Sequence, residues 1–74
     1  SMEYYERLRQ ARADADMTQS QAAELIGTNQ SYYSRQELGK NPFRVEQIAT
    51  LCKCFRVSAD YILGLPKDLN WPRN

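Results

Sequence analysis

The amino-acid sequence predicts an all-α protein built from five helices. No stretch shows sustained alternation of apolar and polar residues, the pattern of a half-buried strand. Apolar residues instead recur at helical spacing, and the three glycines and three prolines fall between those segments. Seventy-four residues form one small domain, so we expect a single core within residues 2–65 and a C-terminal tail in residues 66–74.

The first helix is expected over residues 3–13, and the second opens at Thr18. Thr18 and Gln21 have the Thr-x-x-Gln spacing of a capping box, in which each side chain accepts a hydrogen bond from the other residue's backbone amide. Gly27 ends the second helix, because glycine adopts the left-handed conformation without steric cost. The expected inward stripes are Tyr4 or Tyr5, Leu8, Ala11 and Arg12 on the first helix, and Ala22, Ala23 and Ile26 on the second.

A third helix is expected over residues 30–37, with Asn29 as its cap and its end before Gly39. At about 100° per residue, Tyr33 defines an inner side that also carries Gln36 and Glu37. The opposite side and its flanks carry Gln30, Ser31, Tyr32, Ser34, Arg35 and Leu38.

A fourth helix over residues 44–55 and a short fifth helix over residues 59–63 complete the expected fold. Ser58 is the expected cap of the fifth helix, and Gly64 ends it. The expected buried stripe of the fourth helix is Val45, Ile48, Leu51, Cys52 and Phe55, at i, i+3 and i+4 spacing.

Composition and motifs exclude several classes of function. No apolar run approaches the roughly 20 residues that cross a bilayer, and no signal-type stretch begins the chain, so a cytoplasmic location is expected. There is no histidine, no Gly-rich phosphate loop and no nucleophile beside a base, so we expect no enzyme, cofactor or metal site. Cys52 and Cys54, two apart on a helix, cannot bridge each other and are expected to be small helix residues. The short tail leaves no room for a sensor, so no small-molecule ligand is expected.

Only residues 27–29 separate the second and third helices, which predicts a helix-turn-helix. Arginine and glutamine can pair bidentately with guanine and adenine in the major groove, and hydroxyls pair more permissively. The predicted base contacts are therefore Gln30, Ser31, Tyr32 and Arg35. The predicted phosphate contacts around them are Gln19, Ser34, Lys40, Asn41 and Arg44. The alternative is an ordinary solvated surface.

The charge pattern supports this interpretation only locally, because the net charge is +1. Near the third helix, Arg35, Lys40 and Arg44 outweigh Glu24 if Glu37 is paired internally. Arg12 and Glu37 both lie on inward sides, where each would be costly alone, so we expect a structural salt bridge between them.

The chain resembles the phage repressor and Cro-like family of helix-turn-helix regulators, also called the xenobiotic-response-element type, over residues 5–65. The residues that carry the resemblance are LRQAR at 8–12, MTQ at 17–19, Ala23, Gly27, QSYYSRQELGK at 30–40 and VSADYILG at 57–64. The resemblance implies a compact five-helix domain that binds pseudo-palindromic operators as a dimer. It also implies phosphate contact and helix bracing by Gln19, and base reading by Gln30, Ser31 and Arg35. Departures from the family pattern are Thr28, Gln36, Leu38, Pro42 and Arg56. Gln36 stands where the family commonly has an aromatic residue, so it either reduces core packing or creates a polar contact.

We therefore expect a sequence-specific DNA-binding transcriptional regulator, a repressor, with double-stranded DNA and a second copy of itself as partners. The expected dimer surface is Tyr61, Leu65, Leu69 and Trp71, unless the tail folds back on its own domain. A competing interpretation is a protein-interaction module, such as an antitoxin-like or anti-repressor partner, that uses the same scaffold without reading DNA.

Overall fold

The computed structural model describes residues 2–66 and shows an all-α fold. Leu69 and Trp71, expected at a dimer surface, lie outside these residues. Within residues 2–66, no helix is long and apolar enough to cross a membrane. The helices are α1 Tyr4–Asp14, α2 Gln19–Leu25, α3 Gln30–Glu37, α4 Val45–Phe55 and α5 Ala59–Leu63. The predicted fold class and helix order are confirmed.

The predicted helix caps form as the sequence indicates. The backbone amide of Gln21 donates to Thr18 Oγ1 at 3.1 Å, and the amide of Thr18 donates to Gln21 Oε1 at 2.8 Å, which completes the capping box. Asn29 Oδ1 accepts from Tyr32 N at 2.8 Å, and Ser58 Oγ accepts from Tyr61 N at 3.1 Å. These bonds satisfy amides that have no partner within their own helix.

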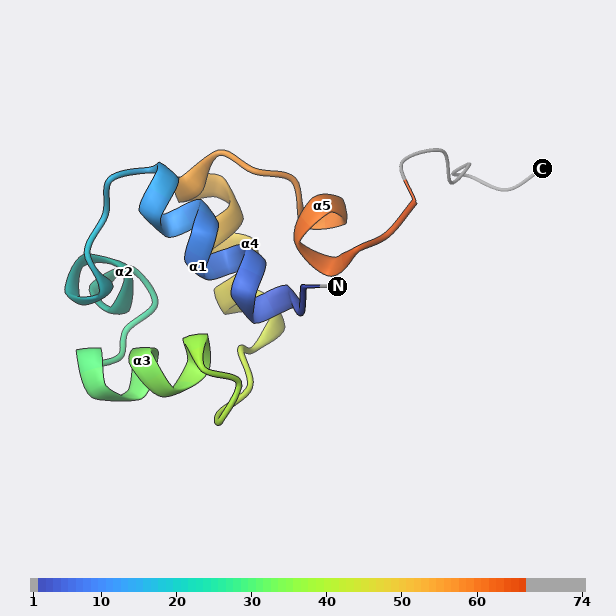
Figure 1. The fold of residues 1–74 in the computed structure, drawn as a ribbon. Coiled ribbons are helices and arrows are strands. Elements are labelled where there is room, and N and C mark those ends of the chain that lie inside the picture. The colour runs from blue at the N-terminus through green and yellow to red at the C-terminus, as the bar shows by residue number, and fades with distance from the viewer. Residues whose placement is uncertain (1, 67–74) are drawn as a thin grey trace.

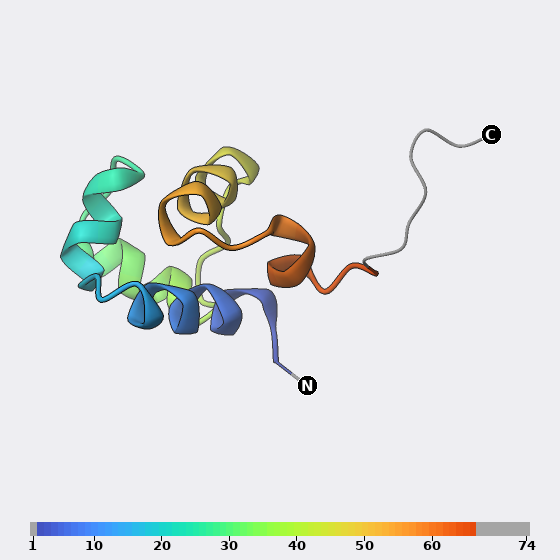
Figure 2. The ribbon, with the colours of Figure 1, turned by 90° about the horizontal axis from the view of Figure 1, so that it is seen from above.

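The helices surround one core, with α1 in contact with α3, α4 and α5 (Figures 1 and 2). Both views place α2 and α3 at one end of the molecule and α5 at the other. In Figure 1, α3 forms the lower edge of the molecule, and no other helix covers its lower side. The buried apolar residues are Leu8, Ala11, Ala22, Ala23, Tyr33, Phe43, Leu51, Cys52, Phe55 and Ile62.

Val45 is not part of the core, which corrects the buried stripe expected on the fourth helix. The helix begins one residue later than predicted, with Arg44 as its N-cap, so Val45 is the first residue of α4. Helical side chains lean toward the N-terminus, and a first-turn side chain therefore projects beyond the end of its helix. Val45 is 79% exposed as a result.

Phe43, which the sequence pattern did not assign to the core, is buried in the α3–α4 loop. Its ring makes edge contacts with Tyr4 and Tyr33, with ring centroids 6.2 and 5.7 Å apart. Its backbone amide donates to the Tyr4 hydroxyl at 3.1 Å. This aromatic cluster joins α1, α3 and the loop, and so fixes where α3 ends relative to the body of the domain.

Candidate nucleic-acid interface

A tight turn sets the direction of α3 relative to α2. Gly27 has φ +72°, the left-handed conformation that closes a helix. Its amide donates to Glu24 O at 3.2 Å, and the amide of Thr28 donates to Ala23 O at 2.9 Å. These two bonds form a Schellman motif, and Asn29 caps α3 directly afterwards. The connection is short and is held by hydrogen bonds to both helices, so α3 has a defined exit angle.

The structure divides α3 into two sides, as the helical spacing predicts. Tyr33, Gln36 and Glu37 are at most 3% exposed and face the core. The outer residues Gln30, Ser31, Tyr32, Arg35 and Leu38 are exposed, and Ser34 is half-buried. The residues predicted to contact bases therefore lie together on one accessible surface of one helix.

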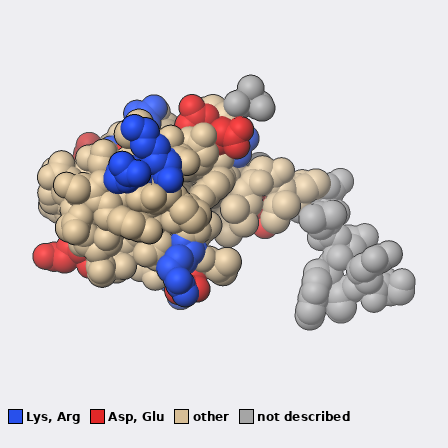
Figure 3. Space-filling model, turned by 90° about the horizontal axis from the view of Figure 1, so that it is seen from below, with Lys and Arg blue, Asp and Glu red and all other residues tan. Residues whose placement is uncertain are grey.

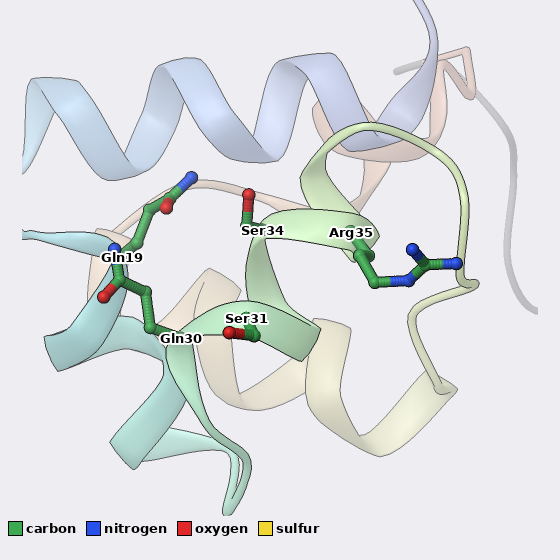
Figure 4. A pocket seen from close by; sticks show the side chains of 5 residues that line it. All are labelled: Gln19, Gln30, Ser31, Ser34 and Arg35. Atoms are coloured by element: carbon green, nitrogen blue, oxygen red, sulfur yellow. The ribbon is translucent and has the colours of Figure 1, made fainter.

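Residues from α2 and α3 line a shallow hollow of about 480 Å³ on this surface. Its lining is polar and comprises Gln19, Gln30, Ser31, Ser34 and Arg35, shown in Figure 4. Ser20 Oγ donates to Gln30 Oε1 at 3.3 Å, which links the start of α2 to the start of α3. Five of the predicted contacts thus come together in space from two helices.

Beneath the hollow, the carboxylate of Glu37 holds α1, α2 and α3 together. Arg12 Nε donates to Glu37 Oε2 at 2.7 Å and Arg12 Nη2 donates to Glu37 Oε1 at 3.1 Å, the bidentate pair expected from the sequence. Gln19 Nε2 donates to Glu37 Oε1 at 2.9 Å. The hydrogen bond to Glu37 raises the pKa of Arg12. Gln19 therefore has a bracing role through its amide nitrogen.

Burial, followed by the negative charge of Glu37, raises the pKa of Tyr33. The carboxylate of Glu37 is paired with Arg12, so it does not act as an unpaired acid near the outer side of α3. With Glu37 paired, the charges near α3 are Arg35, Lys40 and Arg44 against Glu24, and Arg44 in turn contacts Glu46.

The C-terminal end of α3 is closed by a second Schellman motif. Gly39 has φ +78°, its amide donates to Gln36 O at 3.1 Å, and the amide of Lys40 donates to Arg35 O at 2.9 Å. The amide of Asn41 also donates to Arg35 O, at 3.3 Å. Lys40 is exposed and Asn41 is half-buried, so the loop presents a cation beside the outer side of α3.

Gln36 makes a polar bridge between α3 and α4, the second of the two outcomes that the sequence left open for this departure from the family pattern. Its Nε2 donates to Pro42 O at 3.1 Å and to Gln47 Oε1 at 2.9 Å. Gln47 Oε1 also accepts from Arg44 N at 2.9 Å. Sequence reasoning did not assign Gln47, although its position three residues after the cap of α4 is the usual place for such an acceptor.

Charge on this side of the molecule is sparse (Figure 3). Uncharged atoms cover most of the face seen from below, and the basic side chains form clusters separated by uncharged surface. Arg44 Nε donates to Glu46 Oε1 at 2.7 Å, and both side chains are exposed. That contact raises the pKa of Arg44 and lowers the pKa of Glu46. Among the described residues, Arg35 and Lys40 form no salt bridge.

A capped, exposed helix held by a tight glycine turn against a second short helix defines a helix-turn-helix protein. Residues 5–62 match the model of a family described as "Helix-turn-helix domain". This match spans more than half of the sequence, and the chain belongs to the helix-turn-helix domain family. Domains of this kind serve DNA-binding transcriptional regulators, which are not enzymes.

Two known proteins are similar to this chain. It is 38% identical over 65 residues to the uncharacterized HTH-type transcriptional regulator YobD of Bacillus subtilis (strain 168), a match that covers 88% of this chain and 58% of that protein. The chain thus spans little more than half the length of this relative. Its fold is similar to that of the P22 c2 repressor in complex with a synthetic operator, with a TM-score of 0.74, 24% identity, and coverage of 85% of this chain and 96% of that one.

Proposed function

We propose that the protein is a sequence-specific transcriptional repressor whose α3 enters the major groove of a pseudo-palindromic operator, with two copies bound. The observation that carries this proposal is the exposed polar hollow of α2 and α3, where Gln30, Ser31 and Arg35 lie side by side on one helix. Support comes from the helix-turn-helix family and from a similar fold in a repressor described in complex with operator DNA.

The proposed base contacts are Gln30, Ser31, Tyr32 and Arg35. Arg35 suits the two acceptors of guanine, and Gln30 suits the donor and acceptor of adenine. Ser31 lies between them, and the half-exposed ring of Tyr32 provides apolar area for a thymine methyl group. The selectivity of the protein then depends on a few side chains of one short helix.

The proposed phosphate contacts frame this surface. Gln19 borders the hollow on the side of α2, and Ser34 borders it on the half-buried flank of α3. Lys40 and Arg44 follow the end of α3. Arg44 holds Glu46 only through an exposed contact, which is weak enough to be exchanged for a phosphate.

Two copies are proposed because one domain of this size buries little surface on DNA. A two-fold dimer would present its α3 helices to successive major grooves about 34 Å apart. The proposed dimer surface is the apolar area at α5, where Tyr61, Leu63 and Leu65 are each about half exposed.

Selection of bound sites from a pool of random duplexes tests the proposal. We expect enrichment of a two-fold symmetric site with half-sites one helical turn apart. Arg35→Ala should cost about 1 to 3 kcal/mol on that site and relax the base preference at one position per half-site, because it removes a bidentate contact. Lys40→Ala should weaken binding to all sequences about equally, because it removes only a phosphate contact.

Equal losses on selected and random DNA for both variants would remove Arg35 from the set of base readers. A pool with no enriched sequence at all would contradict the DNA-binding proposal and favour the protein-interaction module. Substitution of Tyr61 would then be the informative experiment, since a protein partner would depend on the apolar area at α5.

A further inference from the structure

The α3–α4 loop holds a side-chain contact with one of the proposed base readers. With the amide of Asn41 oriented by its surroundings, its oxygen accepts from Arg35 Nε at 3.2 Å and its nitrogen donates to Lys40 O at 3.0 Å. The backbone amide of Asn41 donates to Arg35 O. Arg35 and Asn41 are therefore joined twice, once through the backbone and once through their side chains.

This contact restricts a side chain that would otherwise sample many rotamers. Figure 4 shows the guanidinium group of Arg35 reaching from α3 toward the loop that follows it. A hydrogen bond at Nε fixes the plane of the guanidinium group. The two terminal nitrogens, Nη1 and Nη2, take no part in that hydrogen bond. Two parallel donors in a fixed plane are what guanine N7 and O6 require in the major groove.

The surroundings of Asn41 fit a role inside the protein better than a role at a phosphate. The residue is half-buried, and both ends of its amide have partners in the protein. The neighbouring Lys40 is exposed and free of salt bridges within the described residues, so it offers the cation that a phosphate would favour. The two adjacent loop residues thus have different surroundings and are suited to different tasks.

We propose that Asn41 is a positioning residue, which holds the guanidinium group of Arg35 in the plane that reads guanine. The inference rests on the proposed function, because it assigns Asn41 to sequence selection by the same surface. This positioning role takes the place of the phosphate contact that the sequence predicts for Asn41.

The test compares base preference and affinity for five variants of the full chain: Arg35→Ala, Asn41→Ala, Asn41→Asp, Lys40→Ala, and Arg35→Ala combined with Asn41→Ala. The probe is a library of random 30-base-pair duplexes, followed by binding to the recovered site and to its single-base substitutions. Arg35→Ala should lower discrimination at the guanine position roughly tenfold. Asn41→Ala should lower discrimination at the same position by at least about threefold and leave other positions unchanged, and Arg35→Ala with Asn41→Ala should behave like Arg35→Ala alone.

Asn41→Asp separates the two roles of this residue. Its carboxylate keeps an acceptor for Arg35 Nε, so the guanine preference should persist, whereas a residue that touches a phosphate would repel it and weaken binding to every sequence. Loss of the guanine preference in Asn41→Asp would overturn the proposal. So would a uniform loss of affinity in Asn41→Ala with its base preferences intact, the behaviour expected of the Lys40→Ala control.

A measurement without DNA distinguishes failure of this inference from failure of the proposed function. In proton–nitrogen spectra of the free protein, the Arg35 Nε–H should exchange with water at least about threefold more slowly than in Asn41→Ala, and Lys40→Ala should leave it unchanged. Equal exchange rates in the native protein and Asn41→Ala would refute the contact, whatever the DNA experiments show. Slow exchange together with an unenriched library would refute DNA reading and leave the side-chain contact standing.

Discussion

At the scale of single residues, Glu37 is the group on which the position of α3 depends most. Its carboxylate accepts from two nitrogens of Arg12 and one of Gln19, so one side chain of α3 binds both α1 and α2. The side chain of Glu37 is 1% exposed and that of Arg12 is 14% exposed. Removing one member of such a pair leaves the other charge without compensation, which costs more than an exposed pair ever contributes.

Glu37→Ala should lower the free energy of unfolding by about 3 kcal/mol, because it strands the guanidinium of Arg12 beneath the domain surface. Urea titration followed by circular dichroism measures this loss. Glu46→Ala is the matched control, since Glu46 also pairs with an arginine but is exposed, and its free energy of unfolding should stay close to that of the native protein. Equal stability of Glu37→Ala and the native protein would mean that the buried pair does not hold α3.

At the scale of elements, α3 is anchored at its two ends by different means. Its start depends on the turn at Gly27 and the cap at Asn29, and a β-carbon added to Gly27 would meet no atom within 4 Å. Its end lies under the ring of Tyr5, where a β-carbon added to Gly39 would approach Tyr5 Cζ to 2.5 Å. Gly39 thus serves both the left-handed end of α3 and the contact between α3 and the start of α1.

Gly27→Ala and Gly39→Ala together separate these two roles. Both place a β-carbon at positive φ, which costs roughly 1–2 kcal/mol. Gly39→Ala should cost more, because the Tyr5 ring must also move. This difference between the two costs should vanish in a Tyr5→Ala background. Urea unfolding of Gly27→Ala and Gly39→Ala, each in the native and in the Tyr5→Ala background, measures it. An equal cost at the two glycines in the native background would show that the Tyr5 contact does not hold the end of α3.

At the scale of the whole molecule, the small net charge limits how strongly electrostatics can drive DNA binding. The net charge is +1, and the cations proposed for phosphates are Lys40 and Arg44, two in each copy. Each neutralised phosphate contributes about −0.9 to the slope of log K against log salt concentration. Affinity and selectivity are therefore expected to depend on shape and hydrogen bonding more than in a strongly basic regulator.

For a dimer with four such contacts, the slope of log K against log salt concentration should be about −4, measured by fluorescence anisotropy on the selected site. Lys40→Ala should make it less steep by about 2, one phosphate for each copy. A slope near −2 for the native protein would point to one bound copy. A slope steeper than about −7 would mean that other cations contact the duplex.

The helices, the caps of α2, α3 and α5, and the two sides of α3 could be predicted from the sequence, because they depend on residues close together in the chain. Thr18 with Gln21, Asn29, the glycine turns and the inward Tyr33 and Glu37 all follow from local spacing and conformational preference. The exposure of Val45, the burial of Phe43 and the bridge from Gln36 to Gln47 could not be predicted in this way. They depend on where other helices lie, since a side chain is buried or hydrogen-bonded only if a neighbour reaches it. The contact between Arg35 and Asn41 belongs to the same class, because only the path of the loop after α3 brings the amide to the guanidinium group.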